Sequence, residues 1–348
     1  MTRPAAAAPT VLRPGWVVGG VVAVAVAVVL GLTIGAVSLP VGDVIGELFS
    51  HVPLIGGKSS LRGPQAAIVT ELRLPRVVLG LIVGALLASA GACYQGVFRN
   101  PLVDPYLLGA AAGAGLTVTV VIVTASASTG SPALPVAAFA GAIGAVGLSW
   151  FVGRAGGRRS AASLLLAGIA ITSFLTAIQT YLQQRNSDTI RQVYSWILGR
   201  LSTADWGDVL LVLPYFVITV VVLIAHRRVL DVLAVGDEEA STLGIPVART
   251  RLILVATASM ATAAAVSVSG LIAFVGIIIP HAVRLAFGSS YRIILPLSIL
   301  YGAAFLALAD LVARTALAPA EIPIGVVTAF VGAPFFILVL RTSSEGRA

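Results

Sequence analysis

Residues 17–39 read VVGGVVAVAVAVVLGLTIGAVSL, and none of these side chains carries a charge. A helix of about 20 apolar residues crosses the roughly 30 Å of hydrocarbon in a bilayer, so this run is long enough to do so. It is longer than the apolar core of a cleaved signal peptide, which has about 7 to 15 residues. The run therefore predicts a first membrane span that the mature chain keeps.

The rest of the chain is also strongly apolar. Of its 348 residues, 58% are hydrophobic and 10% are charged, and the mean hydropathy is +1.03. Soluble domains contain about 25% charged residues. The chain is therefore expected to be an all-α integral membrane protein, a single transmembrane domain over residues 1–348 with ten transmembrane helices. The expected spans are 16–39, 75–97, 105–124, 133–153, 161–183, 207–225, 250–269, 270–287, 293–312 and 322–341.

The charged residues predict the orientation in the membrane. The formal net charge is +8 and the isoelectric point is near 10.4. The basic residues are scattered over short connections, which argues against nucleic acid and for contacts with lipid headgroups. Of the 22 basic residues, 14 fall on the side of the N-terminus. Because basic residues favour the cytoplasmic side, both termini are predicted to be cytoplasmic, with residues 1–15 as a short tail.

A polar stretch interrupts this pattern at residues 236–246, which read GDEEASTLGIP within the predicted cytoplasmic segment 226–249. Asp237 suits a helix N-cap and Gly244 suits the position just after a helix end. Pro246 suits the first position of a second helix. The stretch is therefore predicted to form two short helices joined at a glycine. It is either a plain connection or a docking surface for a cytoplasmic partner, and the paired start and stop signals favour the docking surface.

Small residues recur within the expected spans. Such residues let helices approach closely in lipid, where no hydrophobic effect draws them together. Close packing of one bundle is the expectation, and the alternative is the lining of a pore. The residues concerned include Gly80, Gly84, Ala88, Gly109, Gly113, Gly141, Gly144 and Gly147.

Five further segments bear on the family. They are ELRLPRVVLG (71–80), GACYQGVFRNPLVDPYLLG (91–109), SGLIAFVGIIIPHAVRL (269–285), LADLVAR (308–314) and EIPIGVVTAFVGAPFFILVL (321–340). Together with GDEEASTLGIP they resemble the FecCD-type permeases, the membrane subunits of ATP-driven importers of ferric siderophores, haem and cobalamin. The resemblance runs from Leu72 to Leu340, about three quarters of the chain.

The resemblance implies a fold and a set of partners. The fold is the ten-span permease of type II ABC importers. The partners are a second permease subunit in a homodimer, two cytoplasmic ATPase subunits and an extracytoplasmic substrate-binding protein. The location is the cytoplasmic membrane of a bacterium.

The resemblance also implies roles for individual residues. Arg73, Arg76 and Arg314 are expected to face outward and to receive acidic residues of the binding protein. The alternative for Arg73 and Arg76 is an interfacial position beside Glu71, and for Arg314 a pair with Asp310 one helical turn away. The implied residues are Gly236, Asp237, Glu238, Ala240, Leu243, Gly244 and Pro246 for ATPase coupling, with Ala240, Leu243 and Gly244 at the contact; Arg73, Arg76 and Arg314 for docking; and Ser160, Ala161 and Ala162 for a cytoplasmic gate.

The predicted function is therefore that of an importer permease, with a ferric siderophore as the first ligand and haem or cobalamin as alternatives. The chain has no GxxxxGK[ST] phosphate loop, so it is expected to be no enzyme and to bind no cofactor. ATP and magnesium would be used by the partner ATPase. The three histidines, His51, His226 and His281, lie in separate segments and predict no metal site.

Two other classes of protein remain as alternatives. An ion-coupled secondary transporter places ionisable groups near the middle of the bilayer, and only Asp310 is a candidate for such a position. An intramembrane enzyme would need a nucleophile with a base or a metal cluster, and the sequence shows neither.

Overall fold

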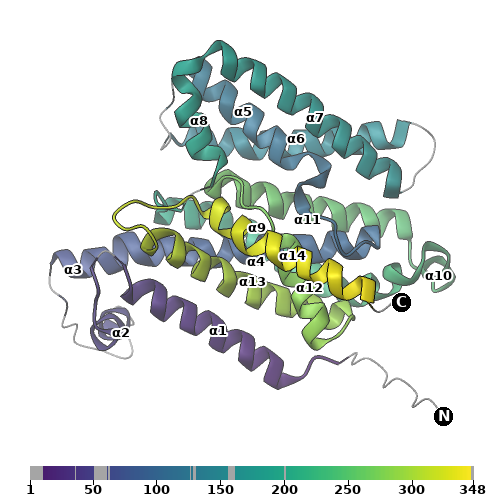
Figure 1. Cartoon of the computed structure of the whole chain (residues 1–348). Helices are drawn as coiled ribbons and strands as arrows, with labels where there is room; N and C mark the ends of the chain where they lie inside the picture. The colour runs from purple at the N-terminus through teal and green to yellow at the C-terminus, as the bar shows by residue number, and fades with distance from the viewer. Residues whose placement is uncertain are drawn as a thin grey trace.

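The structure, a computed structural model, describes residues 11–35, 37–50, 61, 63–125, 127, 131–155, 161–199 and 201–345. Every regular element in these ranges is a helix, apart from one isolated bridge between Leu317 and Ala320. Figure 1 shows the helices as a bundle whose long members run roughly side by side. The predicted all-α class is confirmed.

Ten long helices form the bundle, one for each expected span. Among the described residues, seven of these helices are long and apolar enough to cross a membrane, whereas α5, α12 and the apolar part of α14 are shorter. The expected count of ten complete spans is therefore not reproduced in full. The ten helices are α1 (Pro14–Thr33), α4 (Leu74–Phe98), α5 (Ala110–Ala125), α6 (Ala133–Ala155), α7 (Ala161–Arg185), α9 (Trp206–Val235), α11 (Val247–Ser269), α12 (Val275–Phe287), α13 (Tyr291–Thr315) and α14 (Ile324–Glu345).

Short helices join these long ones at the two ends of the bundle. The start of α1, the end of α14 and the short helix α10 lie at one end, and α2 and α3 lie at the other (Figure 1). The chain thus begins and finishes its helices on the same side, as an even number of crossings requires. The short elements are α2 (Val41–Ser50), α3 (Pro64–Ala67), the π-helix η1 (Ile68–Arg73), the 3₁₀ helices η2 (Pro105–Leu108) and η3 (Ser187–Thr189), α8 (Ile190–Ile197) and α10 (Asp237–Thr242).

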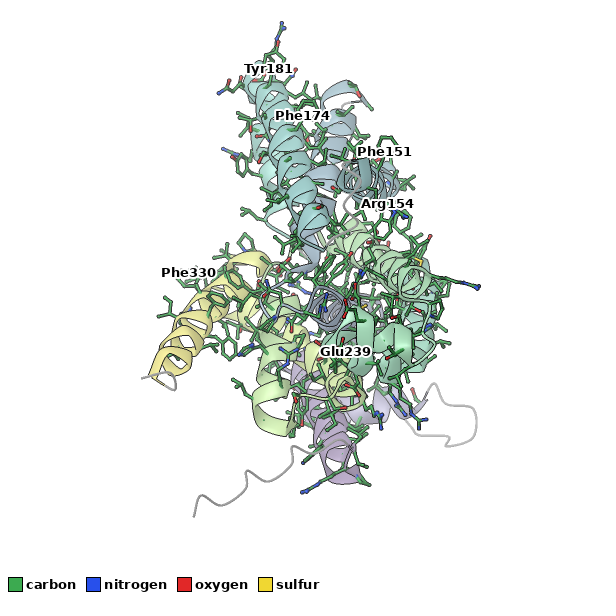
Figure 2. The ribbon with its side chains drawn as sticks, turned by 90° about the vertical axis from the view of Figure 1, so that its right-hand side faces the viewer. Phe151, Arg154, Phe174, Tyr181, Glu239 and Phe330 are labelled. Atoms are coloured by element: carbon green, nitrogen blue, oxygen red, sulfur yellow. The ribbon has the colours of Figure 1, made fainter. Side chains whose placement is uncertain are left out.

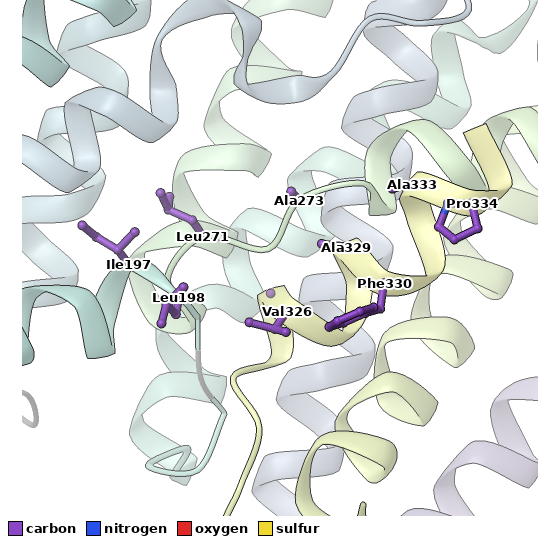
Figure 3. A pocket seen from close by; sticks show the side chains of 10 residues that line it. Ile197, Leu198, Leu271, Ala273, Val326, Ala329, Phe330, Ala333 and Pro334 are labelled. Carbon is purple, nitrogen blue, oxygen red and sulfur yellow. The ribbon is translucent and has the colours of Figure 1, made fainter. Parts of the chain in front are cut away.

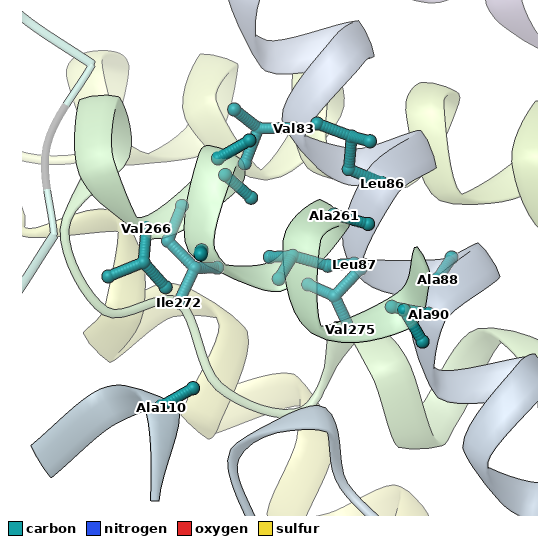
Figure 4. Close-up of a cluster of buried hydrophobic side chains, with 14 of the residues drawn as sticks. Val83, Leu86, Leu87, Ala88, Ala90, Ala110, Ala261, Val266, Ile272 and Val275 are labelled. Carbon is teal, nitrogen blue, oxygen red and sulfur yellow. The ribbon is translucent and has the colours of Figure 1, made fainter. Parts of the chain in front are cut away.

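Helix α4 is the centre of the core. It packs against α9, α11, α12 and α13, and its residues from Val83 to Ala90 meet Ala261 and Val275 of two of these neighbours (Figure 4). Helices α5, α6 and α7 form a second group, which α11 joins to the first. Helices α4, α5 and α6 lack the polar face expected of a helix in a soluble protein, because the core and the lipid beside them are both apolar.

Glycines allow the closest helix contacts in this core. A Cβ at Gly84 of α4 would lie 2.2 Å from the carbonyl oxygen of Gly302 in α13, and one at Gly113 of α5 would lie 2.1 Å from that of Gly141 in α6. These small residues serve packing, as predicted. Gly144 and Gly147 do not, because a Cβ at either position would meet no atom within 4 Å.

Two expected spans begin later than hydropathy predicts. Helix α5 starts at Ala110, because residues 105–108 form the separate turn η2. Helix α12 starts at Val275, and residues 270–274 are not helical, with left-handed backbone at Gly270 (φ +70°) and Phe274 (φ +71°). Hydropathy could not detect either break because the residues on both sides are equally apolar.

Candidate coupling element and arginine cluster

The start of α10 differs from the prediction. Asp237 is the first residue of the helix, and Gly236 before it makes no side-chain cap. The Asp237 carboxylate lies instead 2.8 Å from a terminal nitrogen of Arg251 in α11 and 3.4 Å from one of Arg99 at the end of α4. The predicted N-cap is wrong because two arginines from other helices bind this carboxylate.

The end of α10 is as predicted. Gly244 has φ +77°, in the left-handed region that glycine adopts without strain. Its amide donates to the Ser241 carbonyl at 2.9 Å, and the amide of Ile245 donates to the Ala240 carbonyl at 3.0 Å. This pair of bonds is the Schellman arrangement, which satisfies the last carbonyls of a helix.

No second short helix follows. Pro246 is the residue that precedes the long helix α11, and its carbonyl accepts the amide of Thr250 at 2.9 Å. The element is therefore one short helix, a glycine corner and the beginning of a membrane span. A rigid long helix thus continues directly from the corner.

Helix α10 has a buried and an exposed side. Ala240 is completely buried against the core, so the expected direct contact of Ala240 with a partner is wrong. Leu243 is 69% exposed, and Gly244 is exposed beside it. Glu239 marks the exposed side in Figure 2, which views the bundle from the end that carries α10. The exposed side, here called the coupling face, consists of Glu238, Glu239, Ser241, Thr242 and Leu243.

Arg73 lies at the opposite end of the bundle, where the π-helix η1 meets α4, and its side chain points inward. It is only 6% exposed. One terminal nitrogen donates to the Leu32 carbonyl at 2.7 Å and to the Thr33 carbonyl at 3.2 Å, and the other donates to the Val37 carbonyl. The expectation that Arg73 faces outward is wrong, as is its placement beside Glu71, because the carbonyls at the end of α1 take its donors.

Arg76 joins three segments. Its guanidinium donates to both carboxylate oxygens of Asp310 in α13, with distances between 2.8 and 3.1 Å, and to both oxygens of Glu321, at 2.8 and 3.0 Å. The Asp310 carboxylate is buried, whereas Glu321 is 40% exposed. Bidentate pairs of this kind hold their partners in a defined orientation. The sequence contained Glu321 in the EIPIG segment, but nothing in it showed that Glu321 meets Arg76.

Arg314 is also buried in this cluster. One terminal nitrogen donates to the Gly31 carbonyl in α1, and Nε lies 3.9 Å from Asp310, so the alternative pair within one helix is present. The three predicted arginines therefore come together near the C-terminal end of α13, at the end of the bundle opposite α10. They bind acidic groups and carbonyls of the chain itself.

The remaining predicted residues are less informative. Ser160 lies outside the described residues, and Ala161 and Ala162 begin α7. The His281 ring packs edge-on against Phe335, with centroids 6.1 Å apart, which is the packing role expected. Among the described residues, no group of histidine, cysteine or acidic side chains could hold a metal ion.

An open apolar groove of about 570 Å³ lies beside α14. Leu198 from the end of α8, Leu271 and Ala273 from the break between α11 and α12, and Val326 and Phe330 from α14 line it (Figure 3). Non-helical backbone at membrane depth requires protein or water beside it, because lipid offers no hydrogen bonds. Leu271 and Ala273 of the break line this groove, so the non-helical backbone lies beside α14.

Residues 23–342 match the FecCD transport family. The chain belongs to this family. The cobalamin import system permease protein BtuC of Halobacterium salinarum is 45% identical over 280 residues, which cover 80% of this chain and 75% of that protein. The ferric enterobactin transport system permease protein FepD of Escherichia coli is 35% identical over 324 residues, covering 93% and 94%.

A solved structure has the same architecture. It shows an inward-facing conformation of a metal-chelate type ABC transporter and superposes with a TM-score of 0.82 at 29% sequence identity, covering 95% of this chain and 100% of that one. The family resemblance inferred from the quoted segments is thus confirmed. So is the permease fold.

Proposed function

We propose that the chain is the membrane subunit of an ABC importer that carries a metal chelate across the cytoplasmic membrane. The observation that supports this most directly is α10, a short helix that ends at a glycine corner and carries the exposed coupling face at one end of an otherwise apolar bundle. A ferric siderophore is the proposed ligand, and haem and cobalamin are the alternatives. FepD and BtuC are named for ferric enterobactin and cobalamin, so transport assays with the cognate binding protein and each chelate decide among them.

The structure weakens the ion-coupled alternative. Asp310, the one candidate for a mid-membrane carboxylate, lies five residues before the end of α13. It is held by Arg76 in a bidentate pair, so it is not free to bind a transported ion.

The proposed assembly is a homodimer of this permease with two ATPase subunits and a binding protein. A second copy over the groove of Figure 3 would cover the break between α11 and α12. Helix α12 has 13 residues, and at 1.5 Å each they span about 20 Å of the roughly 30 Å required. The non-helical segment would therefore lie within the bilayer. Tyr106 pairs with the Ile272 amide and carbonyl, and a second copy would shield the rest of this segment from lipid.

The orientation predicts a labelling result. The single cysteine, Cys93, is buried, so Cys93→Ser provides a background without reactive thiols. In that background Ser241→Cys on the coupling face should react with an impermeant thiol reagent only after the cells are opened, whereas Thr203→Cys at the other end should react in intact cells. Labelling of residue 241 in intact cells would reverse the orientation and remove the coupling proposal.

The coupling proposal predicts the effect of Gly244→Val. A Cβ at this position meets no atom within 4 Å, so the substitution acts through the left-handed backbone alone. A β-branched residue there costs about 1 to 2 kcal/mol and should turn the coupling face away from its partner. Transport and permease-stimulated ATP hydrolysis should fall together, while expression and binding-protein capture stay normal. Normal transport by Gly244→Val would contradict the proposal.

Docking of the binding protein stays a prediction, with Arg76 as its remaining candidate. Glu321 is the exposed partner of Arg76, so an incoming carboxylate would replace Glu321 rather than meet a free guanidinium. Arg73 and Arg314 would hold the site in position through their hydrogen bonds to carbonyls of α1.

A further inference from the structure

A second cavity, of about 300 Å³, lies where α6 and α7 meet the beginning of α11. It is at the end of the bundle that carries α10. Trp150, Phe98 and Leu164 form apolar walls, while Arg154, Arg251 and Ser241 supply polar groups.

The arginines around this cavity have unused hydrogen-bonding capacity. The Arg154 guanidinium lies over the Trp150 ring, 5.2 Å from its centroid, and has no carboxylate partner among the described residues. Arg251 is 14% exposed and binds Asp237 through a terminal nitrogen, but its buried Nε has no acceptor. Arg99 shares the same Asp237 carboxylate. Two guanidinium groups therefore share the Asp237 carboxylate and that of Arg154 has none in the described part of the chain, so positive charge exceeds negative charge at the cavity and favours an anion.

The cavity also lies at the edge of the lipid-facing surface. Helix α6 exposes Leu148, Phe151 and Val152 directly before Arg154, and Phe151 is 73% exposed. Figure 2 shows Phe151 and Arg154 on the α6 side of the bundle, apart from Glu239, whereas Ser241 of the coupling face lines the cavity itself. An apolar surface that ends in tryptophan and arginine is typical of the boundary between hydrocarbon and headgroups. Basic pockets between spans on the cytoplasmic side bind lipid headgroups.

We propose that this cavity binds the phosphate of an anionic phospholipid headgroup, with Arg154 and Arg251 as donors. Guanidinium groups bind phosphate through paired hydrogen bonds, and the Arg154 guanidinium has no carboxylate among the described residues to compete with the phosphate. The glycerol part would lie against Trp150 and Leu164. Because Asp237 and Ser241 belong to α10, a bound lipid would tie the end of α6 to the coupling element.

Native mass spectrometry of the purified full-length permease tests this proposal. The protein is equilibrated with equal amounts of phosphatidylglycerol and phosphatidylcholine that have identical acyl chains. We expect the wild type to retain phosphatidylglycerol preferentially and Arg154→Gln to lose about fivefold of that preference, the usual effect of one basic residue near an anionic surface. Arg228→Gln, an exposed arginine at the same end of the bundle, is the matched control and should keep the preference.

A second arm distinguishes a lipid phosphate from a free one. Inorganic phosphate is added to the permease in phosphatidylcholine nanodiscs, and the melting temperature is measured. Stabilisation by inorganic phosphate that Arg154→Gln abolishes, without any preference for phosphatidylglycerol, would overturn the lipid assignment in favour of a free phosphate. An equal preference for phosphatidylglycerol in the wild type and in Arg154→Gln would show that Arg154 does not form a lipid site. Neither result depends on ATPase coupling, so this proposal and the proposed function fail separately.

Discussion

Gly91→Leu should prevent α4 from packing against α12. A Cβ at Gly91 would lie 1.9 Å from the carbonyl oxygen of Gly276, and this neighbour is backbone that cannot move without shifting all of α12. Leucine is a better helix former than glycine by roughly 1 kcal/mol, so the helix itself would not suffer. Overpacking typically costs about 1 to 3 kcal/mol, and contact with backbone at this distance places the cost at the upper end or above.

The measurement is the fraction of detergent-solubilised permease that remains monodisperse after heating. Gly144→Leu is the matched control, because Gly144 also lies inside a membrane helix but has nothing within 4 Å of a Cβ. Gly91→Leu should give little folded protein, and Gly144→Leu should behave like the wild type. Equal stability of the two variants would show that α4 and α12 are not in this close contact.

Asp310→Ala should strongly destabilise the end of the bundle opposite α10. Arg76 would lose its buried partner and keep only Glu321, which is partly exposed. Removing one member of a buried ion pair costs about 3 to 5 kcal/mol, because the remaining charge has lost its compensation in a poorly solvated place. Arg314 would be affected as well, since its Nε lies 3.9 Å from the same carboxylate.

The double variant Arg76→Met with Asp310→Leu separates charge from packing. Replacing both members of a buried pair by apolar residues is often neutral, so the double variant should recover most of the stability that Asp310→Ala loses. Thermal unfolding in one detergent gives the comparison. If the double variant is as unstable as the single one, the ion pair is not the cause of the loss.

Hydropathy and local signals alone account for a large part of this protein. Apolar windows predicted where the ten main helices lie, because a span needs only about 20 residues that lipid tolerates, although α5 and α12 begin later than predicted. The end of α10 at Gly244 followed from the sequence too, because a left-handed residue after a helix strongly favours glycine. The family followed from short segments such as LRLPR and GDEEASTLGIP.

Partners far apart in the sequence could not be inferred in this way. The pairing of Arg76 with Asp310 and Glu321 joins residues more than 230 positions apart, and no local pattern identifies which carboxylate meets which arginine. The same holds for Asp237, which looked like an N-cap but binds Arg251 and Arg99. A lone charge near a helix end is compatible with an exposed or a buried position, and only its neighbours decide between them.

The break between α11 and α12 separates most clearly what the sequence predicts from what only the tertiary structure decides. Residues 270–274 are as apolar as the helices beside them, so the sequence alone predicted this segment as part of a membrane span. The structure shows that its backbone is not helical, and the Tyr106 hydroxyl accepts the Ile272 amide and donates to the Ile272 carbonyl at 3.1 Å each. Backbone that leaves a helix in lipid needs such a partner from another segment, and only the tertiary structure brings Tyr106 to that place.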